Sequence, residues 1–259
     1  LIPAPRRAAQ DQVQQLNAEL EQRVADRTAQ LARVNNELET FSYSVSHDLK
    51  APLRGLDGYS QLLLRHHAGA LDAEGRGFLN NIHLATLQMG QLIDDLLAYS
   101  RLERQTQDLA RLPLAPLVSH VLTACRDELC RRGIVPKLDL PDVAVLADAA
   151  GLSLALRNLV DNALKFSSRS EHPRLSISAR VTDTVVLLSV QDNGIGFDMK
   201  LHDRIFQIFQ RLQRAEDYPG TGVGLAIVSK AMERMGGRCW AESRPGEGAT
   251  FHLQLPRAP

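Results

Sequence analysis

The 259-residue sequence lacks an excess of charge of either sign, because 30 lysines and arginines balance 30 aspartates and glutamates. A surface of one sign, of the kind that binds nucleic acid or an anionic membrane, is therefore not predicted, and any site for a charged ligand has to be local. The sequence also lacks a run of about 18 apolar residues, so we expect no membrane segment in this chain. Its length predicts roughly two domains.

The sequence has few cysteines, and no secretory leader is recognisable at its start. The three cysteines, Cys125, Cys130 and Cys239, form an odd set without metal-ligand spacing. This pattern favours a reducing compartment over a disulfide framework, and we expect a cytoplasmic location. The first residues, LIPAPRR, have neither an initiator methionine nor the apolar core of a secretory signal. We interpret the chain as a fragment of a longer protein.

Proline and glycine are absent between Gln10 and Pro52, where the composition is typical of one long helix. An apolar residue recurs at every seventh position of this helix, as in a coiled coil, at Val24, Leu31, Leu38 and Val45. His47 lies two positions beyond Val45, so we expect its imidazole to face solvent. Pro52 predicts a kink or local loosening, after which the helix resumes.

A second helical pattern follows a polar, glycine-containing break. Its apolar positions alternate at intervals of four and three residues, at Phe78, Ile82, Ala85, Met89, Leu92, Leu96 and Tyr99. Two antiparallel helices with one apolar stripe each cannot bury both stripes alone, whereas two copies of the hairpin form a four-helix bundle. The sequence therefore predicts a homodimer built on an α-helical hairpin.

The second half of the chain mixes the two periodicities. The segment RLPLAPL, residues 111–117, carries two prolines and predicts a boundary between domains at 1–109 and 110–259. Beyond it we expect helices at 116–132, 149–166 and 220–235, strands at 135–140, 175–181 and 186–190, and a C-terminal hairpin that turns at RPGEG. Helices in one layer and a mixed or antiparallel sheet in the other predict an α+β two-layer sandwich.

Polar side chains share one face of the predicted helix LRNLVDNALKF. Asn158, Asn162 and Lys165 are spaced at i, i+4 and i+7, away from the apolar stripe. Such a polar face is most often simply solvated surface. These residue types also suit a nucleotide, because amide oxygens can coordinate Mg²⁺ and a lysine can neutralise a phosphate.

An aspartate and two glycines end the next predicted strand. Asp192 shares a strand face with apolar residues and precedes Gly194 and Gly196. One interpretation is an ordinary turn with a capping aspartate. The other is a carboxylate that accepts a hydrogen bond from an exocyclic amino group such as that of adenine, with glycines that let the backbone pass under a flat ring.

Three further glycines, Gly220, Gly222 and Gly224, lead directly into an amphipathic helix. Its free amide groups and positive end could hold phosphates, although a flexible connection is an equally good reading. A Rossmann motif is not favoured, because the strand and acidic residue that it requires are missing. The intervening IFQIFQRL, residues 205–212, predicts either a mobile lid, with Arg211 or Arg214 reaching a phosphate, or a plain surface helix.

Five stretches of the sequence resemble, in order and spacing, the H, N, G1, F and G2 boxes of sensor histidine kinases of two-component systems. These stretches are SHDLKAPL, NLVDNALKF, DNGIGF, IFQIFQRL and GTGVGLAI. The resemblance covers about residues 35–256, and the residues around His47 are also similar to the subgroup attached to bacterial phytochromes. It implies a dimerisation and histidine phosphotransfer domain at 35–105 and an ATP-binding domain of the Bergerat type at 110–256. A sensor domain would then lie upstream of this fragment.

The resemblance also implies roles for single residues. Asn162 would hold Mg²⁺, with Asn158 nearby and Lys165 on a phosphate of ATP. Asp192 would recognise the adenine amino group. Gly194 and Gly196 would lie beside the adenine, and Gly220, Gly222 and Gly224 would close on the phosphates.

His47 would be the phospho-acceptor under this resemblance. A neutral imidazole offers a nitrogen lone pair that can attack the γ-phosphoryl group, and Asp48 can hold the proton of the other ring nitrogen. Lys50, one turn away, would neutralise phosphate charge, and a hinge at Leu109 to Pro116 would let the ATP domain approach. The final acceptor would be an aspartate on the receiver domain of a response regulator.

One departure and two alternatives accompany this interpretation. Family members that also remove phosphate commonly carry threonine or asparagine four residues after the histidine, whereas this chain has Ala51. One alternative is a nucleotide-binding regulatory module, or a phosphatase-biased variant, that acts on a response regulator. The other is an ATPase of the gyrase or chaperone kind, which leaves the hairpin that carries His47 unexplained.

Overall fold

A computed structural model describes residues 4–104, 107–213 and 217–258 of the chain. The chain divides into two compact units, Leu1–Leu49 and Lys50–Pro259. Within the described ranges, no helix combines the length and the apolar character needed to cross a membrane.

The first unit consists of the N-terminal part of helix α1. This helix runs from Ala4 to His66 over 63 residues and contains Pro52, so the proline does not end it. Of the predicted seam residues, Val24 and Val45 have exposed side chains. The side chains of Leu31 and Leu38 lie outside the described part of the chain, so the coiled-coil seam stays a prediction.

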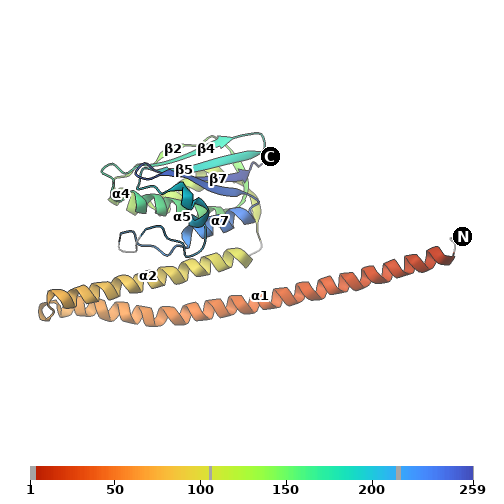
Figure 1. The fold of residues 1–259 in the computed structure, drawn as a ribbon, viewed down its shortest axis with the longest axis horizontal. Coiled ribbons are helices and arrows are strands. Elements are labelled where there is room, and N and C mark those ends of the chain that lie inside the picture. Colours follow the sequence, from red (N-terminus) through yellow and green to blue (C-terminus); the bar gives the residue numbers. More distant parts are fainter. Residues whose placement is uncertain (1–3, 105–106, 214–216, 259) are drawn as a thin grey trace. The chain divides into compact units, whose positions relative to one another are not determined.

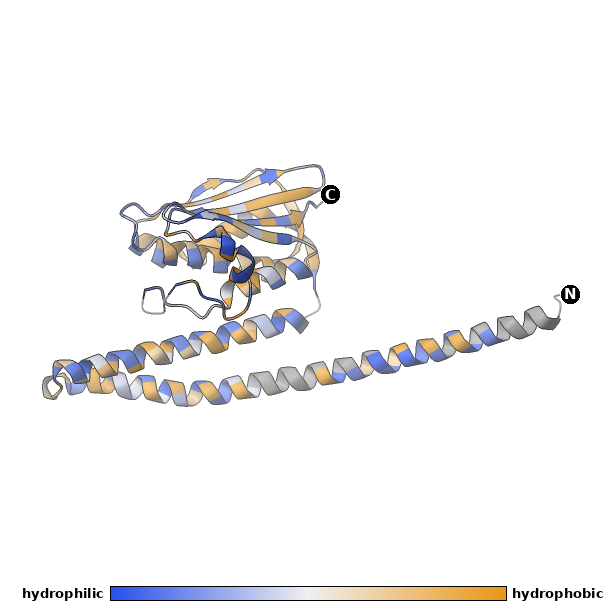
Figure 2. Ribbon diagram, in the orientation of Figure 1, coloured by the Kyte–Doolittle hydropathy of each residue, from blue (hydrophilic) through white to orange (hydrophobic). Residues whose placement is uncertain are grey.

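The second unit begins with a helical hairpin (Figure 1). The last part of α1 is followed by the short 3-10 helix η1, Ala68–Ala70, and by helix α2, Ala73–Arg104. Figure 2 shows hydrophobic positions repeating along α2 between hydrophilic ones. The large apolar side chains that stay exposed on this hairpin include Leu56, Tyr59, Leu63, Phe78, Ile82, Met89 and Leu96. One hairpin therefore does not bury its own apolar stripe.

The rest of the second unit is an α/β sandwich. Its helices are α3 (Leu114–Ala124), α4 (Arg126–Arg131), α5 (Ala149–Phe166), α6 (His202–Ile205) and α7 (Gly224–Arg234), with the 3-10 helix η2 (Met199–Leu201). Its strands are β1 (Leu109–Pro113), β2 (Lys137–Asp139), β3 (Ala144–Asp148), β4 (Leu175–Val181), β5 (Val185–Asp192), β6 (Arg238–Arg244) and β7 (Gly248–Pro256). A five-stranded mixed sheet has the order β2-β4-β5-β7-β6, and β1 pairs with β3 in a separate two-stranded sheet. The predicted two-layer sandwich is confirmed.

The core lies between the five-stranded sheet and helices α3, α5 and α7 (Figure 1). Alternate residues of β5 and β7 are buried, because successive strand side chains point to opposite faces. Helix α5 buries a stripe that includes Leu152, Leu156 and Leu159. It begins where the Asp148 carboxylate accepts the Gly151 amide at 2.6 Å, an N-cap that satisfies one free helix donor. The start of α5 is therefore fixed to the end of strand β3.

One expected helix is divided in two, and of the two alternatives for residues 205–212 the surface helix is not observed. The helix expected at 116–132 is two helices, α3 and α4, which meet at Cys125. The amphipathic segment 205–212 is almost entirely irregular, because α6 ends at Ile205 and Phe209 adopts a φ of 63°. A left-handed backbone at a non-glycine residue interrupts a helix, so apolar spacing alone did not decide this segment.

The hinge expected from Leu109 to Pro116 is also wrong. Strand β1, Leu109–Pro113, pairs antiparallel with β3, from Leu109 opposite Asp148 to Pro113 opposite Ala144. Helix α3 begins at the next residue, Leu114, with Pro116 in its first turn, where a missing amide donor is tolerated. The two prolines therefore form part of a strand end and a helix start that belong to the sandwich.

Candidate functional site

A cleft of about 590 Å³ opens beside the sandwich in the second unit. Its walls are the polar face of α5, the end of β5, the irregular segment around Arg211 and the glycine-rich segment before α7. The lining is completed by residues of α2, namely Gln91, Asp94, Asp95 and Ala98. Segments far apart in the sequence thus meet at one cavity.

Helix α5 places three predicted side chains in this cleft, since Asn158, Asn162 and Lys165 all line it. The Asn158 side-chain amide donates to the carbonyl of Leu154 at 2.9 Å, which leaves Oδ1 as an acceptor. That oxygen would lie 2.6 Å from a Cβ atom built on Gly224. The asparagine oxygen and the start of α7 therefore approach closely, and a larger residue at position 224 would displace the Asn158 side chain.

Lys165 holds its charge in a largely buried place. Burial, followed by the nearby positive charge of Arg211, lowers the pKa of Lys165 to about 8. The ammonium lies 4.2 Å from the ring centroid of Phe166 and would be 3.0 Å from a Cβ atom on Gly220. An anionic ligand in the cleft would stabilise the protonated form of this side chain.

Asp192 ends strand β5 with its side chain turned inward, because the residue is only 6% exposed. Burial raises the pKa of Asp192 to about 6, although backbone hydrogen bonds from Gly194 and Ala249 oppose this shift. The Gly194 amide donates to Oδ1 at 2.8 Å. At neutral pH the side chain is an ionised acceptor on the wall of an otherwise largely apolar part of the cleft.

The two glycines after Asp192 are required by close backbone approaches. A Cβ atom on Gly194 would lie 2.5 Å from the carbonyl oxygen of Phe166. Gly196 has a φ of +60°, and its Cβ atom would lie 2.1 Å from the carbonyl oxygen of Arg244. No other residue type fits this backbone without displacement. Gly196 lines the cleft, whereas Gly194 is not among its lining residues.

The glycine-rich segment before α7 forms another wall. Gly220, Gly222 and Gly224 all line the cleft. Gly222 has a φ of +75°, and a Cβ atom there would lie 2.9 Å from the carbonyl oxygen of Gln210. Gly224 is the first residue of the 11-residue helix α7, and no described side chain caps that end. Its free amides and the helix dipole therefore favour an anion here.

Arg211 also lines the cleft, from the irregular segment that precedes the glycines. Its guanidinium donates to the backbone carbonyl of Tyr218 at 3.0 Å. Arg214, the other arginine that the sequence offered for a phosphate, lies outside the described residues.

His47 belongs to the first unit, on helix α1. Its side chain is 66% exposed, as the heptad register predicts, and its Nδ1 lies 3.3 Å from a carboxylate oxygen of Asp48. Lys50, in the second unit, forms an ion pair with Asp94 of α2. Lys50 therefore has a carboxylate partner within the hairpin, and its role on a phosphate stays a prediction.

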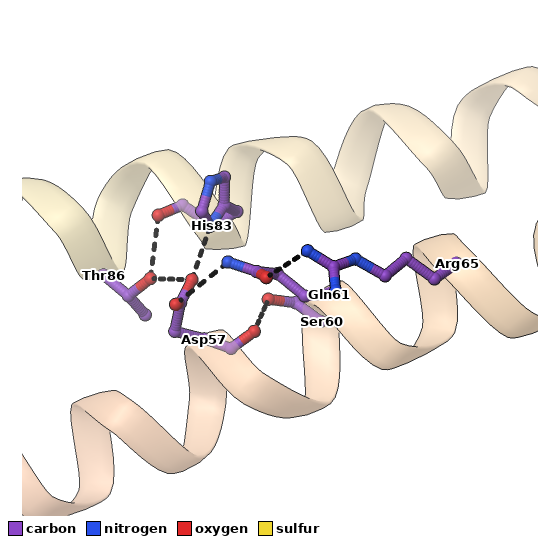
Figure 3. A network of polar contacts seen from close by, with 6 residues as sticks. All are labelled: Asp57, Ser60, Gln61, Arg65, His83 and Thr86. Atoms are coloured by element: carbon purple, nitrogen blue, oxygen red, sulfur yellow. Dashed lines mark hydrogen bonds and ion pairs between the residues drawn. The ribbon is translucent and has the colours of Figure 1, made fainter.

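A polar network crosses the hairpin away from the cleft (Figure 3). Asp57 of α1 accepts from a ring nitrogen of His83 on α2, and Thr86 donates to the same carboxylate at 3.4 Å and to the His83 carbonyl at 2.7 Å. The hydrogen bond from His83 is the largest cause that lowers the pKa of Asp57. The network fixes how the two helices are aligned.

The two halves of the chain match two protein families. Residues 37–105 match the His Kinase A (phospho-acceptor) domain, and residues 147–259 match the family described as histidine kinase-, DNA gyrase B-, and HSP90-like ATPase. The first match contains His47, and the second contains most of the residues that line the cleft. The chain is the catalytic region of a sensor histidine kinase. The resemblance of the five sequence boxes is thereby confirmed, and the second family is one of ATP-binding domains.

Several histidine kinases and phytochromes are similar to this kinase over most of its length. Cyanobacterial phytochrome A of Nostoc sp. is 40% identical over 238 residues, which are 90% of this chain and 31% of that protein. The methanogenesis regulatory histidine kinase FilI of Methanothrix harundinacea is 34% identical, over 92% of this chain and 26% of that protein. This chain therefore spans about a third of the length of the curated relatives.

Solved structures of histidine kinases share the fold. Full-length ShkA in complex with AMPPNP is 29% identical, with a TM-score of 0.61 over 84% of this chain and 45% of that one. Acinetobacter baumannii AdeS is 25% identical, with a TM-score of 0.58 over 82% of this chain and 98% of that one. The ShkA complex contains a nucleotide analogue, in agreement with an ATP-binding cleft in the kinase family.

The sequence did not predict several residues of the kinase cleft. Phe166 and Tyr218 line it, with their rings 5.4 Å apart, and the Thr221 hydroxyl donates to Asp95 of α2. Tyr218 stands two residues before the GTG motif, and Thr221 is the middle residue of that motif. Sequence proximity to the motif was therefore the signal that could have found both residues. Asp95 carried no such signal, because it lies on a helix of the other domain.

The donor atoms of the cleft fit Mg²⁺ held partly by a nucleotide. Oxygen ligands, which Mg²⁺ prefers, are present in the cleft as the amide oxygens of Asn158 and Asn162 and as carboxylates that include Asp161. Among the described residues, no three histidines, cysteines or carboxylates gather into a metal site. A metal bound through phosphate oxygens and one or two side chains suits this arrangement better than an all-protein cage.

Proposed function

We propose that this chain binds ATP with Mg²⁺, phosphorylates His47 and passes the phosphoryl group to an aspartate of a response regulator. The observation that carries the proposal is the cleft itself. It contains Asp192, which can accept from an amino group, and it contains Lys165 and the start of α7, which can hold phosphates. The same chain has a solvent-exposed His47–Asp48 pair.

Each wall of the cleft has a part in holding the nucleotide. Asp192 accepts from the adenine amino group while the ring lies along the glycine backbone at Gly194 and Gly196. The triphosphate reaches Lys165, Arg211 and the amides before α7, which neutralise its charge. Mg²⁺, when bound with the nucleotide, would neutralise the charge that develops in the transfer. Asn162 would hold it, with Asn158 beside it.

The chemistry at His47 follows from its carboxylate neighbour. Asp48 holds the proton on Nδ1, so the lone pair of Nε2 is free to attack. The Nε2–phosphorus bond forms while the bond from the γ-phosphorus to the bridging oxygen breaks, and ADP leaves with the bonding electron pair. Asp48 then stabilises the positive charge on the phosphorylated ring. Lys50 lies close enough in sequence to assist, once it is released from Asp94.

The assembly follows from the exposed hairpin stripe. We propose domains at 1–109 and 110–259 and a homodimer in which two hairpins form a four-helix bundle, because Tyr59 and Phe78 are 72% and 59% exposed and such stripes are normally covered. The partner regulator would dock at this bundle. Histidine kinase ThkA has been solved in complex with the response regulator protein TrrA. A sensor domain upstream and a cytoplasmic location complete the proposal.

Incubation of the purified chain with γ-labelled ATP and Mg²⁺ tests the proposal. An acid-labile, alkali-stable label is expected, and His47→Gln should abolish it while ADP binding persists. His66→Gln, at an exposed histidine at the end of the same helix, is the matched control and should label normally. Asn162→Ala should lose labelling through weaker nucleotide and metal binding.

Three results would contradict parts of this proposal. Label that persists in His47→Gln would exclude the site. ATP binding without any labelled histidine, in a dimer that still holds a regulator, would support a regulatory module instead. Steady ATP hydrolysis that does not depend on His47 would support an ATPase of the gyrase or chaperone kind.

A further inference from the structure

Tyr218 is a buried cleft residue whose hydroxyl group has no hydrogen bond. The residue lines the cleft and is only 5% exposed. Its Oη atom has no hydrogen-bond partner among the residues that the structure describes. Buried hydroxyl groups are almost always paired, because removing them from water without a partner costs free energy. A partner that is part of a ligand would account for this atom.

A second buried atom shares this lack of a hydrogen bond but has a local explanation. Nε2 of His252 lies 3.7 Å from the Glu242 carboxylate, and its ring stacks on Trp240 with centroids 5.1 Å apart. Both of these neighbours lie on strand β6, which pairs with the strand β7 that carries His252. Tyr218 differs because it faces the cavity that we assign to a nucleotide.

The position of Tyr218 is fixed by contacts that do not use its hydroxyl. The ring packs against Phe166, and the Arg169 guanidinium lies 5.0 Å from its centroid. Arg169 is itself held by Asp217 at 2.9 Å, and Arg211 binds the Tyr218 carbonyl. These contacts hold the phenol ring in place, and the Tyr218 hydroxyl remains without a hydrogen bond among the described residues.

We propose that the Tyr218 hydroxyl is a nucleotide-binding group, which hydrogen-bonds an oxygen of the ribose-phosphate part of the bound adenine nucleotide. This inference rests on the ATP site of the proposed function. It adds a binding residue outside the five sequence boxes, and it links nucleotide binding to the segment that carries Arg211.

The place of Tyr218 in the cleft selects that part of the nucleotide. Its ring packs on Phe166, whose carbonyl oxygen approaches Gly194 next to the adenine acceptor Asp192. The side chain of the residue before Phe166, Lys165, lies at the phosphate end. Between base and terminal phosphates the nucleotide offers sugar hydroxyls and phosphate oxygens, and a phenol can donate to either.

The test compares Tyr218→Phe with the unaltered chain by calorimetry with ADP and Mg²⁺. The phenylalanine keeps the ring contacts with Phe166 and Arg169 and removes only the hydroxyl. We expect ADP affinity to fall by about three- to tenfold if the acceptor is a sugar oxygen, and by more than about tenfold if it is a charged phosphate oxygen. The nucleotide-free protein should melt no lower than before. The unchanged melting temperature separates a ligand contact from a structural one.

Two results would overturn the inference. Unchanged ADP affinity in Tyr218→Phe would remove the contact, and a lower melting temperature without nucleotide would mean that the hydroxyl is satisfied inside the protein. Tyr59→Phe, the same change at an exposed tyrosine, is the matched control and should alter neither quantity.

Further variants separate this inference from the proposed function. If Asp192→Asn also leaves ADP affinity unaltered, the nucleotide site itself is wrong. If Asp192→Asn weakens ADP and Tyr218→Phe does not, only the role of Tyr218 fails. With 2′-deoxy-ADP, a lost difference between the unaltered chain and Tyr218→Phe assigns the bond to the 2′-hydroxyl, and a retained difference assigns it to another oxygen of the ribose-phosphate part.

Discussion

At the scale of single residues, Lys165 makes nucleotide binding depend on pH in a defined direction. Burial lowers the pKa of Lys165 to about 8, so without ligand the side chain loses its charge as the pH rises through that value. Because phosphates bind the charged form, ADP affinity should fall above pH 8, by at most about tenfold per pH unit. Titration calorimetry between pH 7 and 9.5 measures this slope.

The same pH range keeps the titration of Asp192 out of the measurement. Asp192, with its pKa raised to about 6, stays ionised throughout. Lys165→Arg is the comparison, because arginine remains charged and should flatten the profile. A flat profile in the unaltered chain, or an identical slope in Lys165→Arg, would exclude Lys165 as the source.

At the scale of elements, the network of Asp57, His83 and Thr86 should make the hairpin sensitive to acid (Figure 3). The pKa of Asp57 is lowered, first by the hydrogen bond from His83. A lowered carboxyl pKa stabilises the fold above the unfolded pKa of about 4 and loses that contribution as the pH falls through the folded value. Asp57→Asn should therefore lower the melting temperature near pH 7, and this difference should shrink below about pH 4.

Melting followed by helical circular dichroism gives that comparison. Asp26→Asn is the control, since Asp26 is an exposed carboxylate on α1 that accepts from Gln22, four residues before it, and belongs to the same helix as Asp57. If both substitutions lower the melting temperature equally at every pH, the network contributes nothing specific to the hairpin.

Elements with a local signal could be predicted, and those with distant partners could not. Helix α5 runs over Ala149–Phe166, as its apolar stripe indicated, and Asn158, Asn162 and Lys165 share its other face in the cleft. Strand β1 is different, because Leu109–Pro113 is held by Ala144–Asp148, a partner that no local pattern reveals. Thr221 and Asp95 belong to the same class, since their contact depends on how α2 meets the glycine-rich segment.

At the scale of the whole molecule, the exposed stripe predicts that single charges will separate the subunits. Ile82 is 42% exposed on α2 in the single chain and would be buried in the proposed bundle. Ile82→Asp should raise the dimer dissociation constant by about 100-fold or more, because an unpaired charge would be buried. Light scattering after size exclusion measures the mass.

The matched control is an apolar residue far from the bundle. Val135 is 90% exposed and precedes strand β2 of the sandwich, so Val135→Asp should leave the dimer intact. A monomeric unaltered chain, or a dimer that survives Ile82→Asp at micromolar concentration, would contradict the four-helix bundle.

The pairing of β1 with β3 has a consequence for how far the nucleotide can travel. Because Leu109 is already anchored in the sandwich and α2 ends at Arg104, the connection between these two residues spans at most about 18 Å when fully extended. Because this connection is short, it keeps the bound ATP at a high effective concentration around the bundle, as a short linker does for a tethered ligand. Phosphorylation should then be nearly independent of protein dilution for as long as the bundle itself holds together.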